Sequence, residues 1–530
     1  MGGMLIFLVL SHYIALASNM ADLGFFLTNL RNVGTEYARA FFWHTQPLMI
    51  VWGWGYRELP ADVAPGVLLV MQAVILLSSV AAIWRVFGTW SGIAMLLYYP
   101  FWVNALFDFH FDHLAIPLLS IFFIACEKQY FAWAAVSATA LIIVKEPFAL
   151  QTVACGAYFW WLAYSLRGQG YSIRLLLLGL YLVAVGGGMF YVLTNWLIPY
   201  FADDTSHFGL TSEAFAWLGK GLINIVWMIV SRPDLILAEV IGTPGKLIYL
   251  SVIFGLLAFV PLLRPAALIV ALPILMISMF SRLENYYDYA NHYTAGVIMP
   301  TIVAFRNGLP IAYKYFSAVL EWMQRVRCWW YLKRALVRKD LIFSWFLGFW
   351  LLIGHWAFAS SPISRLFWSD KVWSYSWRSY WPTERTAMMK EAMLKYIPVG
   401  PEVSVSTQNT VDWYHLADRK MYWLFPMGIA EPQKVMDWSN RSLKGLWWFI
   451  RTGYRSPTIT HNRFADYVVL DLKRPYFVLD RGCEWIYGEC RDKGMERKFL
   501  GWLSYTRDHY DTVFEKDGFM ILKRQSLAAD

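Results

Sequence analysis

Charged residues are scarce in this chain. Asp, Glu, Lys and Arg make up 16% of its 530 residues, against about 25% in soluble domains. Apolar residues reach 58% and the mean hydropathy is +0.41, whereas soluble domains contain about 45–50% apolar residues. This balance excludes an ordinary soluble enzyme and predicts an integral membrane protein.

The chain also lacks the short motifs of several enzyme classes. It has no Walker A loop to hold nucleotide phosphates, so ATP-driven transport has no support. It has neither a His-Glu-x-x-His zinc helix nor a Gly-x-Ser-x-Gly nucleophile turn.

Positive charge exceeds negative charge, and the formal net charge is +9. A nucleic-acid partner is not needed to explain it, because Lys and Arg gather in the cytoplasmic loops of membrane proteins. Between 306 and 339 the only acid is Glu321, against the cations Arg306, Lys314, Arg325, Arg327, Lys333, Arg334, Arg338 and Lys339. We therefore expect a basic cytoplasmic loop at 306–340 and no nucleic-acid partner.

Long apolar runs predict the membrane spans. Runs of about 17–24 residues are long enough to cross a bilayer as helices. About eleven spans are expected, at roughly 4–18, 66–84, 90–106, 113–126, 130–144, 148–165, 175–199, 246–263, 266–281, 292–309 and 341–359. Charges interrupt the apolar stretch 216–242, which we interpret as interfacial helices.

This topology predicts an α-helical polytopic protein of the cytoplasmic membrane with two domains. Residues 1–360 form the transmembrane domain, with outer loops at 19–64, 107–113, 200–245 and 282–291. Residues 361–530 form a small extracytoplasmic α/β domain, with strand-like runs at 403–406 and 467–471 and an Asp517-Gly518 hairpin. An extracytoplasmic position would allow a disulfide between Cys483 and Cys490. Cys126, Cys155 and Cys328, in or beside spans, are interpreted as small buried apolar residues.

Polar side chains of unusual kinds all fall on the outer side of this topology. Asp22 follows the first apolar run, where a carboxylate is costly unless it faces water, a partner or a substrate. A carboxylate partly withdrawn from water can act as a general base. The alternative is an ordinary helix N-cap, which is a common use of Asp.

The second outer loop holds the run Asp108-Phe109-His110-Phe111-Asp112-His113. The two histidines share a helical face, and Asp108, His110, Asp112 and His113 together offer ligands for a divalent metal such as Mg²⁺ or Mn²⁺. The alternatives are substrate contact without a metal, or a helix start that Asp112 caps.

Further outer-face residues are candidates for substrate binding. Lys145, beside Glu146, suits a lipid-linked phosphate at the bilayer surface, although a snorkelling lysine with a counter-charge gives the same pattern. His44 is either a substrate contact or a simply hydrogen-bonded interfacial histidine. Arg282 and His292 lie in and beside the last outer loop of the membrane domain.

Several short motifs give the chain a likeness to known membrane enzymes. It resembles the GT-C class of membrane glycosyltransferases, and within it a large family of multi-spanning predicted membrane proteins catalogued as a domain of unknown function. The motifs are Asp22-Leu23-Gly24-Phe25-Phe26, His44 with Pro47, Phe109-His110 followed by Leu114-Ala115-Ile116-Pro117-Leu118-Leu119, Lys145-Glu146, Ser361-Pro362-Ile363-Ser364, and Ala465-Asp466-Tyr467-Val468-Val469-Leu470-Asp471.

The resemblance implies a function as well as a fold. It implies transfer of a sugar from a polyprenyl-phosphate donor to a glycan, lipid or protein acceptor on the outer face, with inversion at the anomeric carbon. Asp22 would be the catalytic base, and Lys145, His110 and Arg282 would hold the lipid phosphate. Members of the class divide between metal-dependent and metal-independent types. Two alternatives stay open, a flippase or transporter of lipid-linked sugars and a non-catalytic scaffold in envelope polysaccharide assembly.

Overall fold

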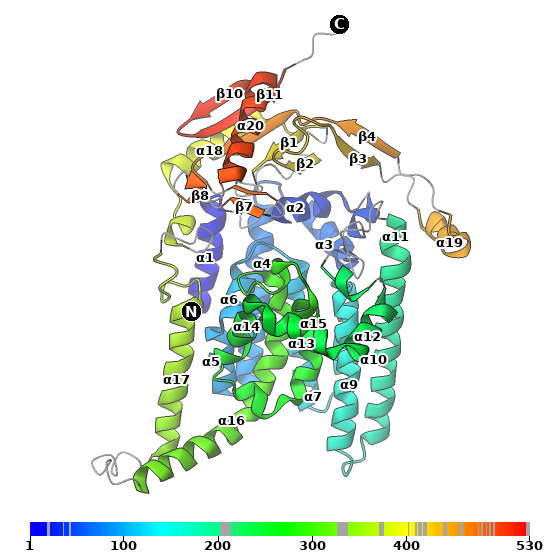
Figure 1. Cartoon of the computed structure of the whole chain (residues 1–530), viewed down its shortest axis with the longest axis vertical. Coiled ribbons are helices and arrows are strands. Elements are labelled where there is room, and N and C mark those ends of the chain that lie inside the picture. Colours follow the sequence, from blue (N-terminus) through cyan, green and yellow to red (C-terminus); the bar gives the residue numbers. More distant parts are fainter. Residues whose placement is uncertain are drawn as a thin grey trace.

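A computed structural model gives the architecture of the chain (Figure 1). It describes residues 1–530 except 18–21, 35, 42–43, 202–213, 220, 326–337, 370–375, 401, 409–410, 412–415, 417–420, 438–441, 455–458, 475, 479–480, 484, 487–488, 491–492 and 526–530. Helices dominate the first 360 residues, and strands occur only in the C-terminal part of the described chain.

The first part of the chain folds as a bundle of helices. Its α-helices are α1 (Gly2–Ile14), α2 (Asp22–Asn32), α3 (Leu48–Arg57), α4 (Ala64–Phe87), α5 (Thr89–Leu97), α6 (Tyr99–Leu106), α7 (Ala115–Glu127), α8 (Phe131–Ala140), α9 (Pro147–Ser165), α10 (Ser172–Val192), α11 (Ile198–Phe201), α12 (Leu222–Ser231), α13 (Pro233–Gly242), α14 (Pro244–Leu250), α15 (Leu272–Phe280), α16 (Ala295–Arg325) and α17 (Lys339–Phe358). Short 3₁₀ or π helices extend several of them, including η2 (Phe111–Leu114), η4 (Leu193–Leu197) and η11 (His292–Thr294), and the 3₁₀ turn η10 (Glu284–Tyr286) lies between α15 and α16.

Four helical segments of the described chain are long and apolar enough to cross a membrane. They are Ala64–Phe87, Ser172–Phe201, His292–Met323 and Lys339–Phe358. A fifth span is counted if the pair Pro233–Gly242 and Pro244–Gly255, bent by 85°, is one broken span. The structure thus supports a helical membrane protein with four or five spans, and the expected total of about eleven stays a prediction.

Some expected spans are broken into shorter helices. The run 90–106 is divided between α5 and α6 at Tyr98, whose backbone is extended. Pro100 lies in the first turn of α6, where its missing N–H is tolerated, whereas it would interrupt a continuous helix. The run 246–263 ends its helix near Gly255, and Ala258 and Phe259 then adopt positive φ. Hydropathy alone does not register these backbone breaks.

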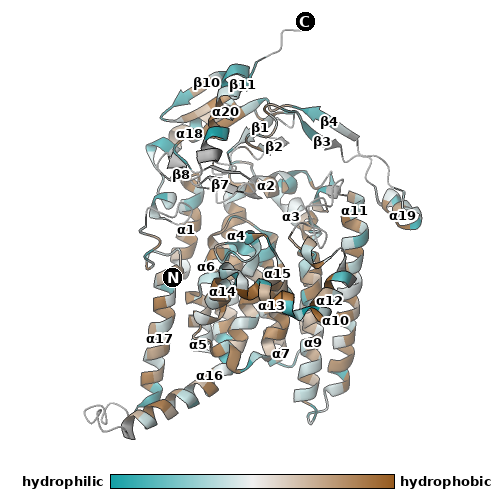
Figure 2. Ribbon diagram, in the orientation of Figure 1, coloured by the Kyte–Doolittle hydropathy of each residue, from teal (hydrophilic) through white to brown (hydrophobic). Residues whose placement is uncertain are grey.

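The loops divide between the two ends of the bundle. The turn from α9 to α10, the end of α16 and the start of α17 lie at the end away from the C-terminal domain (Figure 1). The second half of α16 belongs to the basic segment 306–340, which the sequence assigns to the cytoplasmic side of the membrane. Hydrophobic residues dominate the bundle helices, and hydrophilic colour is concentrated in the C-terminal domain (Figure 2). The start of α9 and the loop before α7 lie toward that domain.

The C-terminal part contains the small α/β domain that the sequence predicts. Its five-stranded sheet has the order β10-β11-β5-β1-β2, with β1 parallel to both β2 and β5 and the other pairs antiparallel. The described strands are β1 (Ser404–Thr407), β2 (Met421–Leu424), β3 (Gln433–Asp437), β4 (Ile459–Arg463), β5 (Tyr467–Asp471), β6 (Tyr476–Val478), β7 (Arg481–Cys483), β8 (Trp485–Ile486), β9 (Glu489–Cys490), β10 (Tyr510–Lys516) and β11 (Phe519–Arg524).

Two helices cover opposite faces of this sheet. Successive side chains of a strand point to opposite faces, and in β5 Val469 packs with Met389 and Met393 of α18 (Glu384–Tyr396). Val468 packs on the other face with Phe499 and Leu503 of α20 (Lys493–His509). A third helix, α19 (Leu443–Thr452), lies between β3 and β4 in sequence.

The end of α1 fixes the domain onto the bundle. Leu16 is buried in the core of the C-terminal domain with Met389 and Val405. The Arg474 guanidinium donates to the backbone carbonyl of Ala15 at 3.3 Å and also to that of Leu16. These contacts hold the domain over one end of the bundle. The loops that the sequence predicts to be outer loops lie at the same end.

Candidate functional site

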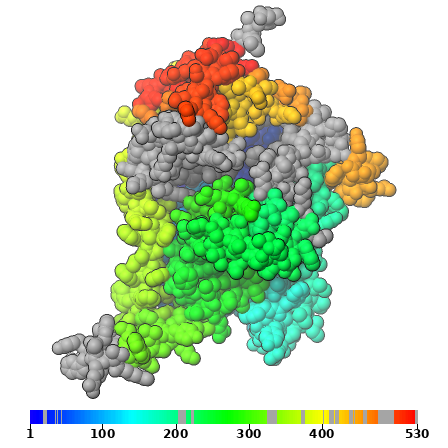
Figure 3. Space-filling view, viewed as in Figure 1, coloured from blue at the N-terminus to red at the C-terminus, as the bar shows by residue number. Residues whose placement is uncertain are grey.

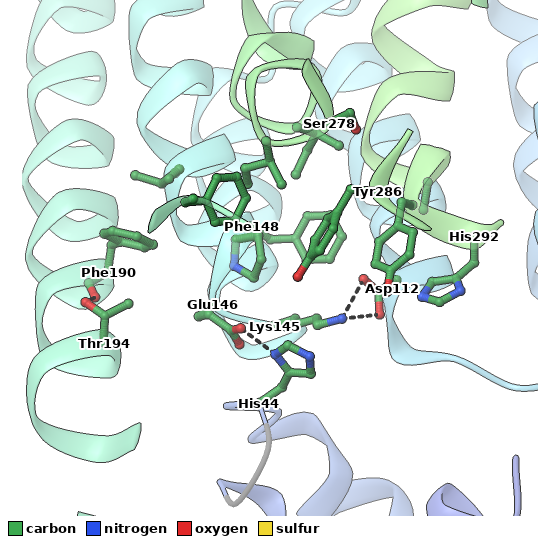
Figure 4. Close-up of a pocket in the computed structure, with 17 residues that line it drawn as sticks. His44, Asp112, Lys145, Glu146, Phe148, Phe190, Thr194, Ser278, Tyr286 and His292 are labelled. Atoms are coloured by element: carbon green, nitrogen blue, oxygen red, sulfur yellow. Dashed lines mark hydrogen bonds and ion pairs between the residues drawn. The ribbon is translucent and has the colours of Figure 1, made fainter. Parts of the chain in front are cut away.

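A pocket opens at this end of the bundle, beside the start of α9 (Figure 4). Its empty volume is about 840 Å³, counting the space at its mouth. Apolar and aromatic side chains make most of its wall, and charged groups gather at one end. The lining residues are His44, Asp112, Lys145, Glu146, Pro147, Phe148, Leu150, Phe190, Thr194, Phe215, Ile274, Ile277, Ser278, Tyr286, His292, Tyr293 and Ala295.

The charged end is built at a break between two helical segments. A short 3₁₀ turn ends at Ile143, and Pro147 begins α9 because proline is well suited to the first helical turn. Lys145 and Glu146 therefore lie in the connection between the two segments. Both side chains are buried, with residue exposures of 5% and 4%.

Lys145 pairs with a carboxylate from the second outer loop. Its Nζ lies 3.3 Å from both Oδ1 and Oδ2 of Asp112 in η2. Burial raises the pKa of Asp112, but the Lys145 ammonium and the nearby histidines together outweigh burial and hold this pKa below its ordinary value. Burial likewise lowers the pKa of Lys145, and the carboxylates of Asp112 and Glu146 bring it above its ordinary value. Both groups are therefore ionised at neutral pH.

Glu146 is bonded to the first outer loop. Its Oε1 lies 2.5 Å from Nδ1 of His44, and its Oε2 accepts the backbone N–H of Thr45 at 3.1 Å. Burial raises the pKa of Glu146. The charge of His44, its hydrogen bond to the carboxylate and the charge of Lys145 together lower this pKa by more, so it lies below its ordinary value. The carboxylate fixes the His44 ring at the rim of the pocket, where its side chain is 31% exposed.

Three histidines form a group behind the Lys145–Asp112 pair. The rings of His110 and His292 lie 3.8 Å apart, and His113 lies 5.9 Å and 6.2 Å from them. Burial, together with His292, lowers the pKa of His110 well below its ordinary value, so this ring is neutral. In the described part of the chain, both ring nitrogens of His113 and Nδ1 of His292 have no hydrogen-bond partner.

The predicted site residues are only partly brought together. The pocket collects His44, Asp112, Lys145, Glu146 and His292 from separate stretches of sequence, while His110 and His113 stand next to His292. Asp108 is buried, and its charge adds to the effect of burial in raising the pKa of Tyr380. It does not line the pocket.

Arg282 lies away from the pocket. Its side chain is 55% exposed and pairs with Glu239 at 3.3 Å, a carboxylate that also binds the buried Lys246 at 3.0 Å. The guanidinium lies over the Trp217 ring, 4.8 Å from its centroid. In this position Arg282 does not line the pocket, so the structure gives no support to its predicted contact with a phosphate there.

Two sequence predictions concern side chains outside the described part of the structure. Asp22 is the first residue of α2, but the position of its carboxylate is not among the described features. Cys483 ends β7 and Cys490 ends β9, and their sulfur atoms are likewise outside the described features. The catalytic base and the disulfide stay predictions. Cys126 and Cys155 are buried free cysteines, as expected, and Cys328 lies outside the described residues.

The predicted metal ligands do not converge. Among the described residues, no group of three or more His, Cys, Asp or Glu side chains is arranged to hold a metal ion. Asp112 is instead paired with Lys145. A Mg²⁺ or Mn²⁺ ion therefore stays a sequence prediction.

The aromatic wall of the pocket was not predicted from the sequence. Tyr286 and Tyr293 stack with ring centroids 4.9 Å apart, and the Lys145 ammonium lies 6.0 Å from the Tyr293 centroid. Phe190 and Thr194 enter from α10 and η4. The available signal was the tyrosine-rich run Asn285-Tyr286-Tyr287-Asp288-Tyr289 next to His292.

Comparison with known proteins identifies a family. The family model described as "Predicted membrane protein (DUF2079)" matches residues 25–411. No curated protein and no solved structure matches the chain. The match covers most of the bundle and the first strand of the C-terminal sheet, so it includes every described residue of the pocket.

Proposed function

The chain belongs to this family of predicted membrane proteins, and on that premise we propose that it is a membrane glycosyltransferase of the GT-C type. It transfers a sugar from a polyprenyl-phosphate donor to an envelope glycan, lipid or protein on the outer face of the cytoplasmic membrane. The reaction inverts the configuration at the anomeric carbon.

One observation carries the proposal, namely the pocket with an apolar wall and a buried cation at one end. A polyprenyl phosphate has the same division, with a long apolar tail and an anionic head at the bilayer surface. Phe148, Phe190 and Ile274 supply apolar wall, and Lys145 supplies the cation. Ligand pockets usually combine such a wall with a few placed polar groups.

Lys145 is suited to receive a phosphate although it is already paired. Both contacts to Asp112 are 3.3 Å long, whereas charge-assisted N–H···O bonds are usually about 2.7–2.9 Å. An ammonium has three N–H donors, so Lys145 can donate a hydrogen bond to a phosphate oxygen without losing its pair with Asp112. Asp112 and the neighbouring Glu146 hold Lys145 in its charged form.

The proposed chemistry is a single displacement. The oxygen of an acceptor hydroxyl attacks the anomeric carbon of the sugar while Asp22 takes the hydroxyl proton. The bond from the anomeric carbon to the phosphate oxygen breaks, and the polyprenyl phosphate leaves with the electron pair. Lys145 stabilises the charge that develops on the leaving phosphate, and His44 and His292 lie at the same end of the pocket.

The test is sugar transfer by purified protein in detergent. A panel of labelled polyprenyl-phosphate sugars serves as donors and an envelope lipid extract supplies acceptors. General-base catalysis contributes about 10²–10⁴-fold, so Asp22→Asn should lower transfer by that factor. Asp62→Asn is the matched control, since Asp62 is an exposed acid of the same outer loop.

A second pair of variants tests the pocket. Lys145→Met should weaken donor use strongly, whereas Arg282→Gln removes an exposed cation that lies outside the pocket and should leave transfer unchanged. Equal transfer by wild type and Asp22→Asn would remove Asp22 as the base. Tight binding of one donor with no transfer at all would favour the flippase or the scaffold instead.

A further inference from the structure

Helix α19 is a short, well-formed helix of the C-terminal domain. It connects β3 to β4 and lies away from the sheet, at the side of the molecule (Figures 1 and 3). Ser442 caps its start by accepting the backbone N–H of Gly445 at 3.1 Å. Gly453 ends it with a φ of 70°, a conformation that glycine adopts at little cost. Both ends are thus defined by the local sequence.

One face of α19 is attached to the end of a membrane helix. The Tyr200 hydroxyl donates to the Ser442 carbonyl at 3.0 Å and accepts the Ser442 N–H at 3.3 Å. The Tyr200 and Phe449 rings lie 5.7 Å apart, and Leu446 packs in the same cluster. A Cβ at position 445 would overlap the Tyr200 hydroxyl, so glycine permits this close approach.

The opposite face combines aromatic rings with positive charge. Trp447 and Trp448 are 61% and 54% exposed, although Trp is usually among the well-buried residues. Lys444 and Arg451 are exposed on either side of them. The spacing i, i+3, i+4, i+7 puts these four residues on one face of the helix.

The attachment point indicates the depth of α19 in a membrane. Tyr200 lies at the end of the 30-residue segment Ser172–Phe201, one of the candidate spans. At about 1.5 Å per residue such a segment is roughly 45 Å long. A bilayer is about 30 Å thick in its hydrocarbon core and about 40–45 Å with its headgroups. The end of this segment, and α19 with it, therefore lies at headgroup level.

We infer that α19 is an interfacial membrane helix, whose outward face binds the headgroup region of the leaflet on the side of the C-terminal domain. Trp rings prefer this depth because one edge is polar and the body is apolar. Lys444 and Arg451 attract anionic lipid headgroups. A protein partner fits this site less well, because a surface at headgroup level that carries Trp beside cations is matched by lipid itself.

This contact gives the C-terminal domain a second attachment. The first is the buried end of α1 with Arg474, and α19 holds the edge that carries β3 and β4. The helix under α19 is the same helical segment that contributes Phe190 and Thr194 to the pocket wall. The lipid surface, α19 and the pocket are therefore connected through one membrane helix.

Photolabelling of the full-length protein tests the inference. The protein is placed in vesicles of phosphatidylcholine and phosphatidylglycerol that contain a phospholipid with a diazirine on its acyl chain close to the headgroup. Labelled peptides are located by mass spectrometry after illumination. Label is expected on Trp447 and Trp448, as on Trp345 of the span α17, which is 73% exposed. Leu500 of α20, which is 49% exposed, is the control without label.

Variants separate lipid contact from mere exposure. The double substitution Trp447→Gln and Trp448→Gln should abolish labelling of α19 and leave that of α17 unchanged. The helix itself should stay attached in this variant, because its contacts with Tyr200 lie on the other face. Labelling of α19 no greater than that of α20, with α17 labelled, would overturn the inference. Cross-linking of α19 to another protein in native membranes, in place of lipid, would also overturn it.

Discussion

Removal of the positive charge of Lys145 should destabilise the protein more than any surface substitution. The ammonium and the Asp112 carboxylate are 7% and 8% exposed, and their N–O distance is 3.3 Å. With an effective dielectric constant of about 20, Coulomb attraction at 3.3 Å is about 5 kcal/mol. Taking both ions out of water costs several kcal/mol each, so the net contribution of the pair is much smaller than this attraction.

The cost of breaking the pair is nevertheless large. Lys145→Met keeps most of the side-chain volume but leaves Asp112 as a buried, uncompensated charge. Loss of one partner of a buried pair costs about 3–5 kcal/mol, and we expect about 3 kcal/mol here because Asp112 can also take up a proton. Asp112→Asn in the Lys145→Met background should recover most of this loss. The coupling energy of the double-mutant cycle should therefore be about 2–3 kcal/mol.

Denaturant unfolding in detergent measures these energies, with intrinsic Trp fluorescence as the signal. Lys128→Met is the matched control, because Lys128 is an exposed lysine at the other end of α7, and surface substitutions usually stay within about 0.5 kcal/mol. If Lys145→Met cost no more than Lys128→Met, or if the two substitutions at the pair were simply additive, the structural account of this pair would be wrong.

Two further predictions concern helix packing and acid stability. Gly156→Ala should destabilise by about 1–3 kcal/mol, because its Cβ would lie 2.6 Å from the Gly179 carbonyl oxygen, whereas Gly187→Ala meets no atom within 4 Å and should be tolerated in the same unfolding assay. The depressed pKa of Glu146 stabilises the fold above its ordinary value of 4.5 and ceases to do so as pH falls through the lower folded value. The melting temperature should therefore decrease as the pH is lowered from about 4.5. Glu146→Gln should make this decrease smaller, and an unchanged pH profile in the variant would contradict the stabilising role of the Glu146 carboxylate.

Local sequence signals predicted the C-terminal domain well. The run Tyr467–Asp471 is a central buried strand, β5, and Asp517-Gly518 is the turn between β10 and β11 with positive φ at both residues. These features depend on short-range chemistry, namely β-propensity and turn geometry. The membrane bundle was predicted less completely. Apolar runs locate helical segments, but the backbone breaks at Tyr98 and Phe259 depend on proline placement and packing that hydropathy does not measure.

The candidate site was predictable in its members but not in its geometry. Positive loops fixed which segments share one side, and the structure brings His44, Lys145 and His292 to one pocket. Arg282 shared the same pattern, yet its charge is satisfied by Glu239. Sequence alone gives no means to separate these cases, because the partner of a charge is decided by tertiary contacts.

The adjacent residues Lys145 and Glu146 connect two loops to one helix. Lys145 reaches Asp112 in the second outer loop, and Glu146 reaches His44 and the backbone of Thr45 in the first. Because neighbouring residues at a helix start point in different directions, one dipeptide can fix two loops relative to each other. The first loop also carries Asp22, the proposed base. On the proposed function, we expect loss of the Glu146 contacts to shift the first loop relative to the Lys145 ammonium, which would make Glu146 a positioning residue.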